Sequence, residues 1–356
     1  MKQYNILIHQ KTFEKAKTYL NGLQSNKFTA GKHLKHKLKL EKKAISIITT
    51  DEFLEILINT KKPQIFAESE LVGDGSDWNQ YELSILGDIS ISVPVFVFDN
   101  GKHFQPDVYS VPIEATLIFV PGALLRNDKG QIPVDWIDIC LNNQFNPDAY
   151  YGLYERRLFP PFLHANNLAK LKNKLAFITL PGIGCGQFAG KFRGKLGAEL
   201  RNALVRFLNN YNNRFPYIRA VYLDTYSSCE NERFEINHIS FFVRPLKKGN
   251  ETKPQLCQPC HYQEKGDDFS NCILFSLVAW DHVSWPGNDF YSGYRSTDDG
   301  VKAAATDSMK KITGIEGKYD VQNNTYDPPK EYRNWNELVL ENKIYIIVKN
   351  NIFVLS

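Results

Sequence analysis

The feature that most constrains the fold of this chain is a strand, a glycine-rich turn and a helix, all predicted within residues 175–208. Residues 175–180 (LAFITL) form a short, mostly apolar run of the kind that is typical of a strand buried on both faces. Pro181 ends the run, and glycines follow at positions 182, 184, 186 and 190. Apolar residues then recur at helical spacing over 196–208, which predicts an amphipathic helix.

The glycine-rich turn is a candidate binding site for an anion. Glycines leave backbone N–H groups open to close approach, and a helix N-terminus adds partial positive charge. We therefore predict a phosphate-bearing ligand at this turn, and an ordinary tight turn between strand and helix is the alternative. The Walker A phosphate loop is excluded, because Gly190-Lys191 is followed by Phe192 and position 185 holds a cysteine.

The dinucleotide-binding pattern G-x-G-x-x-G/A is the second known phosphate motif that the turn could represent. Gly184, Gly186 and Ala189 match it, and Asp224 follows at the end of the next predicted strand. However, Asp224 lies about twice as far along the chain as the 20 residues expected for the ribose-binding carboxylate. An NAD-binding oxidoreductase therefore stays an alternative rather than the favoured interpretation.

A second segment, residues 279–300 (AWDHVSWPGNDFYSGYRSTDDG), carries four aspartates among aromatic side chains. Carboxylates and aromatic rings suit a nucleotide sugar, since carboxylates bind ribose hydroxyls, stabilise an oxocarbenium-like centre or orient water. The alternative is a turn-rich loop in which aspartates cap helices and close turns, which would suffice for Asp298 and Asp299. The glycine turn and this segment follow two predicted strands directly, so we expect them to meet at one edge of a sheet.

Alternating strands and helices along the rest of the chain indicate an α/β fold with a parallel or mixed sheet. Strands are predicted at 3–9, 44–49, 63–67, 81–98, 116–120, 218–223, 238–243, 272–280, 344–348 and 352–355, the last two as a hairpin. Helices are predicted at 13–23, 52–59 and 301–310, and an ordered loop at 146–164. Residues 134–141 suit a strand or a helix, and 245–266 read as an insertion or a boundary.

Composition excludes several classes of protein. The net charge of +4 is too small to indicate a nucleic-acid partner. No apolar run approaches the length of about 18 residues that a membrane span needs, and the N-terminus does not resemble a signal peptide, so we expect a soluble protein.

Six cysteines are too few for a disulfide framework. The sequence Cys257-x-x-Cys260-His261 would fit half a zinc site or a haem attachment, but a second pair of ligands is missing, so we predict no metal and no cofactor.

Residues 31–43 carry six lysines and two histidines. Such a segment is usually a solvated face, and a docking surface for an acidic partner is the alternative.

The strand, LPGIGCGQFAG and the helix that follows resemble the macrodomain family, in which a glycine loop holds the diphosphate of ADP-ribose. The 279–300 segment resembles the aspartate-rich segment of an atypical branch of bacterial effectors that hydrolyse ADP-ribose from ubiquitin. The N-A-A-N segment of ordinary macrodomains is absent, and Gly87-Asp88-Ile89 either matches their adenine-binding G-D-I or is a coincidence. The resemblance covers roughly residues 80–310 and implies an α/β three-layer sandwich with a mixed, mostly parallel sheet. We expect this domain to span 44–356, with an N-terminal extension over 1–43 and an insertion or linker at 245–270.

The resemblance also implies which residues bind and which catalyse. Asp281, Asp289 and Asp299 would carry hydrolysis of the ADP-ribosyl bond. The residues implied to bind ADP-ribose are Gly182, Ile183, Gly184, Cys185, Gly186, Gln187, Phe188, Trp285, Asn288 and Arg295. The implied activity is that of an ADP-ribosylhydrolase acting on an ADP-ribosylated protein, with ubiquitin as the implied substrate protein and the host cytoplasm as the implied location. A non-catalytic reader of ADP-ribosylated proteins is the alternative.

Overall fold

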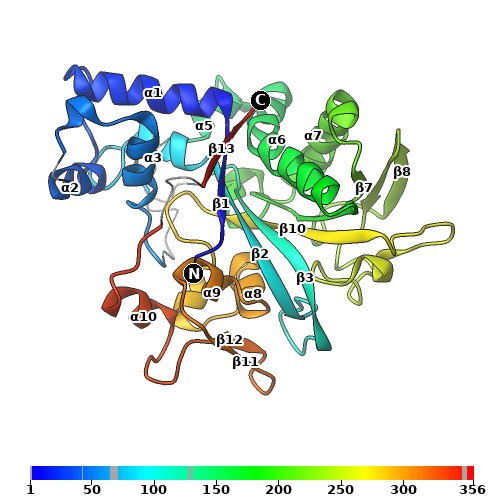
Figure 1. The fold of residues 1–356 in the computed structure, drawn as a ribbon. Helices are drawn as coiled ribbons and strands as arrows, with labels where there is room; N and C mark the ends of the chain where they lie inside the picture. The colour runs from blue at the N-terminus through cyan, green and yellow to red at the C-terminus, as the bar shows by residue number, and fades with distance from the viewer. Residues whose placement is uncertain (1, 42, 65–70, 127–129, 131, 347–350) are drawn as a thin grey trace.

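A nine-stranded sheet runs through the molecule in the computed structural model, which describes residues 2–41, 43–64, 71–126, 130, 132–346 and 351–356 (Figure 1). The strands, in their order across the sheet, are β13 (Ile352–Leu355), β1 (Asn5–His9), β2 (Ile89–Asp99), β3 (Val108–Pro121), β10 (Cys272–Trp280), β6 (Leu175–Pro181), β7 (Ile218–Asp224), β9 (Ile239–Val243) and β8 (Glu232–Ile236). Neighbouring strands are parallel from β3 through β10, β6 and β7 to β9, and β13 is parallel to β1. The pairs β1–β2, β2–β3 and β8–β9 are antiparallel. The prediction of a mixed, mostly parallel sheet is confirmed.

Both faces of the central strands are buried, as their apolar sequences predict. In β6, Ala176, Ile178 and Leu180 point into the core beneath α6 (Pro147–Leu171) and α7 (Leu196–Tyr211), whereas Phe177 belongs to the core on the opposite face. The same alternation runs through β7. Because successive side chains of a strand point to opposite faces, a strand between two cores must be apolar throughout.

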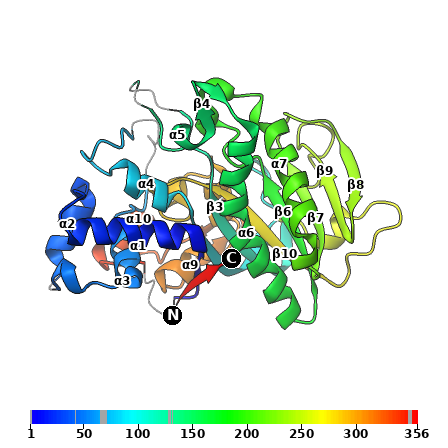
Figure 2. The same ribbon diagram turned by 90° about the horizontal axis from the view of Figure 1, so that it is seen from above.

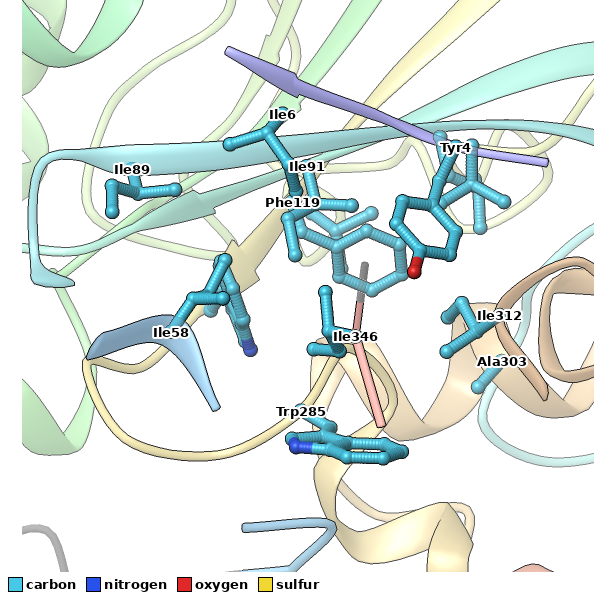
Figure 3. Close-up of a cluster of buried hydrophobic side chains, with 14 of the residues drawn as sticks. Tyr4, Ile6, Ile58, Ile89, Ile91, Phe119, Trp285, Ala303, Ile312 and Ile346 are labelled. Carbon is cyan, nitrogen blue, oxygen red and sulfur yellow. The ribbon is translucent and has the colours of Figure 1, made fainter. Parts of the chain in front are cut away.

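The other face is covered by α8 (Asp298–Ala304), α9 (Ser308–Thr313) and the segment that follows β10. Figure 3 shows how this layer meets the sheet: Ile91 and Phe119 of the sheet, Ile312 of α9 and Trp285 of the aspartate-rich segment form one hydrophobic cluster. The same layer contains α10 (Trp335–Glu341) and the hairpin of β11 (Lys318–Asp320) and β12 (Thr325–Asp327). Three layers result, as expected for the macrodomain-like sandwich.

A group of helices lies at the end of the molecule opposite β8 (Figures 1 and 2). It consists of α1 (Gln10–Gln24), α2 (Lys32–Leu40), α3 (Thr50–Ile58) and α4 (Gln80–Leu86). Strand β1, although it falls within the predicted extension 1–43, pairs with β2 and β13 inside the main sheet. The lysine-rich segment contains α2, a helix whose lysines are exposed or half-buried.

The predicted loop at 146–164 is wrong, since these residues form most of the long helix α6. Asn146 caps it by accepting hydrogen bonds from the N–H groups of Asp148 and Ala149, and Pro147 takes the first position, which needs no N–H. The Pro160-Pro161 pair, which suggested a loop, lies inside the helix and is buried. Packing of its tyrosine, leucine and phenylalanine side chains against the sheet and α7 outweighs the loss of two backbone donors.

Four strand predictions also need correction. Residues 81–98 divide into α4 and β2, because Asn79 and Glu82 form a capping box that starts a helix. The predicted strand at 44–49 holds only a 3-10 turn, Ile45–Ile47. At the C-terminus 344–346 are not a strand, 347–350 lie outside the described residues, and β13 pairs in parallel with β1. Pro63 and Gln64 are not in a strand, and 65–67 lie outside the described residues.

Residues 134–141, whose sequence suited a strand or a helix, contain both. They form a short helix, α5 (Trp136–Ile139), and a strand, β4 (Cys140–Leu141), which pairs with β5 (Gln144–Phe145). The segment 245–270 is ordered against the sheet, with Leu256, Tyr262 and Phe269 buried. Among the described residues, no helix has the length and hydropathy needed to cross a membrane. No group of three or more potential metal ligands occurs in that part of the chain either.

Candidate functional site

The glycine-rich turn and the aspartate-rich segment lie at the same edge of the sheet. Strands β3, β10, β6 and β7 are parallel, and Trp280 pairs with Pro121 at one end of this row while Pro181 pairs with Asp224 at the other. Their carboxyl ends therefore share an edge, where ligands of α/β sheets bind. Gly182, Gly186 and Asp298 line one cavity of about 420 Å³ there. The prediction that the two segments meet is confirmed.

The shape of the glycine turn depends on its contact with the end of β3. Gly184 has φ of +74°, and a Cβ at this position would lie 2.6 Å from Tyr154 Oη and 2.7 Å from Ala123 N, so only glycine fits. Tyr154, on α6, donates a hydrogen bond to Ile183 O at 2.6 Å and accepts one from Ala123 N at 3.2 Å. A single buried hydroxyl thus joins the two loops.

The turn presents backbone donors as predicted, but no regular helix begins directly after it. The N–H groups of Gly184 and Gly186 have no acceptor within the described residues. A 3-10 turn, Gln187–Phe192, follows, and α7 begins only at Leu196. The expected contribution of a helix N-terminus at the glycines is therefore wrong, and an anion here would be held by the turn's own N–H groups.

The other residues predicted in the turn have partners that extend the site. Gln187 Oε1 accepts a hydrogen bond from Arg126 Nη1 at 2.7 Å, and Phe188 O accepts one from Leu125 N at 2.8 Å. The ring of Phe188 lies 6.4 Å from that of His282 in the aspartate-rich segment. Burial raises the pKa of Cys185 to about 12, so its thiol is protonated at neutral pH.

The carboxylate of Asp281 shapes the first turn of the aspartate-rich segment. Its Oδ1 accepts hydrogen bonds from the N–H groups of Val283 and Ser284 at 2.6 Å each. Its Oδ2 accepts bonds from the Ser284 hydroxyl and from Asn288 Nδ2, the latter at 3.2 Å. Asn288, predicted to bind ligand, therefore contacts a predicted catalytic aspartate.

Asp289 and Asp299 are joined by one hydroxyl group. Thr297 Oγ1 lies 2.6 Å from Asp289 Oδ1 and 2.6 Å from Asp299 Oδ1, and it caps α8 by accepting from Gly300 N. Asp289 Oδ2 also accepts from the N–H groups of Ser296 and Thr297 at 3.0 Å. A Cβ on Gly300 would overlap the Asp289 carboxylate, so this packing requires glycine.

The electrostatics of the three aspartates favour a protonated Asp299. Asp281, Asp289 and Asp299 are 3%, 1% and 3% exposed. Burial, and then the nearby charges of Asp281, Asp289 and Asp298, raise the pKa of Asp299 well above its usual range. A neutral carboxylic acid is a proton donor, which is a role that Asp299 could fill if a substrate reached it.

Arg295 and Trp285 hold the aspartate-rich segment in place. Arg295 forms a bidentate ion pair with Asp99 at the end of β2, with 2.8 Å from a guanidinium nitrogen to each carboxylate oxygen. It also donates hydrogen bonds to Asn324 O and Lys102 O. Trp285 Nε1 donates to Lys61 O at 3.1 Å, and its ring packs edge-on against Tyr291. Trp285 lines a separate cavity, away from the glycine turn.

Sequence reasoning missed a buried charge network beneath both loops. Arg157, on α6, pairs with Asp135 at 2.7 Å and with Asp88 at 3.0 Å, and donates to Gly122 O at 2.9 Å. Asp135 Oδ2 accepts from Leu124 N at 2.7 Å. The network therefore holds the end of β3. No local pattern marks it, since its members are far apart in the chain.

The network also reaches the aspartate-rich segment. His282 Nε2 lies 3.3 Å from Asp135 Oδ2, within ion-pair range although not aligned as a hydrogen bond. Burial would raise the pKa of Asp135, but Arg157 and His282 lower it below its usual range. Asp88 of the G-D-I match is itself buried and bound by Arg156 and Arg157, so its carboxylate is already occupied.

The cavity beside the glycine turn also holds Lys302 and Gln255, which sequence reasoning did not assign, and Asp224. Lys302 Nζ donates to Asp298 Oδ2, Gln255 Oε1 and Leu277 O, and burial lowers its pKa. Asp224, which the dinucleotide comparison singled out, accepts from Tyr226 N and Leu246 N at 2.8 Å each. Its pKa is raised by burial.

Comparison with known proteins agrees with this geometry. A family model described as "Macrodomain effector MavL" matches residues 4–332, which include both loops and the network beneath them. No curated protein matches the chain. Because the match covers most of the sequence, the chain belongs to the macrodomain effector family of MavL.

Proposed function

We propose that this protein binds ADP-ribose at the glycine-turn edge of the sheet and hydrolyses the ADP-ribosyl bond of a modified protein. The observation that carries the proposal is that the glycine turn and the aspartate-rich segment meet at the same edge of the sheet. The glycine turn offers the backbone N–H groups of Gly184 and Gly186, which have no acceptor among the described residues. The aspartate-rich segment brings Asp299, whose pKa is raised well above its usual range, and Asp289 to the same Thr297 hydroxyl. The turn suits the diphosphate, and the carboxyl pair suits cleavage of a glycosidic bond.

In the proposed reaction, the bond between the anomeric carbon of the ribose and the acceptor atom breaks, and a water oxygen forms the new bond to that carbon. Asp299 donates its proton to the departing nitrogen or oxygen of the protein side chain. Asp289 stabilises positive charge on the ribose or takes the proton from water. Asp281 holds the turn through Ser284 and Asn288. This assignment makes Asp299 an acid, because its raised pKa favours the protonated form.

A non-catalytic reader is the second candidate, and one observation favours it. The carboxylates of Asp281 and Asp289 are almost fully buried, and their hydrogen bonds all remain within the aspartate-rich segment. Hydrolysis therefore requires this segment to expose Asp299 when substrate binds. Binding without turnover requires no such movement.

The test separates the two candidates with matched variants. ADP-ribose binding is measured by calorimetry, and release of ADP-ribose is measured on ADP-ribosylated ubiquitin, the substrate suggested by the resemblance. Asp299→Asn should keep binding within about threefold and reduce release by at least 100-fold, in line with loss of a general acid. Asp148→Asn, on the exposed surface of α6, is the control and should leave release unchanged. Binding without release in the unmodified chain would indicate a reader.

The glycine turn offers a second test, of binding alone. A Cβ on Gly186 would have no atom within 4 Å, so Gly186→Ala should fold normally. It adds a methyl group to the wall of the cavity, and we expect ADP-ribose affinity to fall at least tenfold. Unchanged affinity in this variant would contradict a diphosphate site at the turn.

A further inference from the structure

A second cavity, of about 330 Å³, lies between α2, the residues that follow α3 and those that follow α10. Lys37 and His36 reach it from α2, Lys62 from beyond α3 and Lys343 from beyond α10. Trp285 contributes an aromatic wall. Three segments far apart in the sequence thus bring basic side chains to one place, and none of these residues belongs to the glycine-turn cavity.

The described residues that line this cavity include basic side chains and no carboxylate. Lys37, Lys62 and Lys343 form no ion pair with any residue in the part of the chain that the structure describes. Burial lowers the pKa of His33, another lining residue, and the neighbouring Lys62 lowers it further, although Asp77 lies 3.2 Å from its Nε2.

The adjoining cavity has a different lining. That cavity, of about 810 Å³, shares Lys37 and Lys343 but is also lined by Glu41, Asp51 and Glu52. Its charges are mixed, and Lys43 pairs with Glu52 there. The smaller cavity beside Trp285 therefore differs from its neighbour in having no carboxylate among the described residues of its lining, although the two cavities share Lys37 and Lys343.

We propose that the smaller cavity binds a small phosphate-bearing ligand, at a site separate from the glycine turn. Lysines act as point charges for phosphate, and their convergence from three elements suits an anion with several charged oxygens. A volume of 330 Å³ is at the lower end of small-molecule sites, so it fits a phosphate ester better than the surface of a folded protein. The indole of Trp285 offers an apolar face to the remainder of such a ligand.

Hydrogen bonds join residues that line this cavity to the aspartate-rich segment. Lys61 Nζ donates to His282 O at 2.6 Å and stands 3.9 Å from the centre of the Trp280 ring. Lys62 N donates to Val283 O at 2.9 Å, and Lys62 O accepts from Trp285 N at 2.7 Å. A ligand that restrains Lys62 and Trp285 therefore also restrains the segment that carries Asp281.

Calorimetric titration of the full chain with pyrophosphate at low ionic strength tests this proposal, since salt screens exposed charges. The double variant Lys37→Ala/Lys343→Ala should weaken binding at least tenfold. Lys35→Ala, which removes an exposed lysine of the same helix that does not line the cavity, should change it less than twofold. Because pyrophosphate also resembles the diphosphate proposed for the glycine turn, these titrations are made in the Gly186→Ala background, in which binding at the turn is weakened. Failure of one site is then distinguishable from failure of the other.

A titration with adenosine monophosphate then distinguishes the source of the phosphate. Tighter binding than pyrophosphate, lost in the double lysine variant, would indicate a nucleotide whose base packs on Trp285. Binding of pyrophosphate alone would indicate recognition of the phosphate group. Equal binding by the parent and the double lysine variant, or loss of binding in Gly186→Ala, would overturn the proposal.

Discussion

Replacing Asp135 by asparagine should destabilise the protein strongly, because this carboxylate balances a buried charge. Asp135 contacts Arg157 Nη2 at 2.7 Å, Leu124 N at 2.7 Å and His282 at 3.3 Å, and Asp135 is only 2% exposed. The asparagine keeps the shape of the side chain but removes its charge. Breaking a buried ion pair by removing one partner costs about 3 to 5 kcal/mol.

The corresponding shift in melting temperature follows from the length of the chain. For 356 residues, an unfolding entropy of about 2.1 cal/mol/K per residue gives roughly 0.75 kcal/mol/K. The variant should therefore melt about 4 to 7 °C below the parent in thermal denaturation followed by circular dichroism at neutral pH. ADP-ribose affinity should also fall, since Asp135 holds Leu124 on one loop and lies beside His282 on the other.

Two further variants identify the cause. Asp148→Asn removes an exposed carboxylate that pairs with Arg206, and a surface pair of this kind is worth about 0 to 1 kcal/mol, so its melting temperature should move little. Adding Arg157→Met to Asp135→Asn removes the uncompensated cation and should recover part of the loss. A single Asp135→Asn variant that melts within about 1 °C of the parent would refute the reasoning, because the network would then not hold the two loops.

Three other changes have expected outcomes that can be measured. Gly300→Ala forces the Asp289 carboxylate from its place, so urea titration should show a loss of at least about 2 kcal/mol, and the proposed hydrolysis should fall with it. A loss below about 0.5 kcal/mol would mean that the segment adjusts. Gly184→Ala combines a positive φ with two close contacts, so we expect destabilisation of about 1 to 3 kcal/mol by thermal denaturation. Asp299→Asn should stabilise the protein near neutral pH and less at acidic pH. The folded pKa of Asp299 is raised above its unfolded value, so its contribution is intact below the unfolded pKa and declines as the pH rises toward the folded one. Melting curves over this range would contradict the assignment if the difference between variant and parent did not grow with pH.

Local sequence patterns predicted the elements that build the site. The run at 175–180 and the helical spacing over 196–208 give β6 and α7, since burial on both faces and an amphipathic stripe each leave a periodic signal. The meeting of the glycine turn with the aspartate-rich segment was also predictable. Both follow strands of one parallel sheet, whose carboxyl ends share an edge.

Signals that depend on context were interpreted wrongly. Pro160 and Pro161 suggested a loop, whereas packing against the sheet keeps them inside α6. The β-prone residues of 81–98 suggested a strand throughout, whereas the capping box of Asn79 and Glu82 starts the helix α4. Local propensity is a weak preference in such stretches, and burial of a large apolar face overrides it.

The sequence by itself determined the α/β class, the macrodomain resemblance and the two loops that carry the candidate chemistry. Only the tertiary structure decided how those loops are supported and charged. Arg157, Asp135 and His282 meet beneath them from positions far apart in the chain, and no spacing rule links such residues. Likewise, the raised pKa of Asp299 comes from burial and from the closeness of other carboxylates. Both conditions arise only when the segment is folded against the sheet.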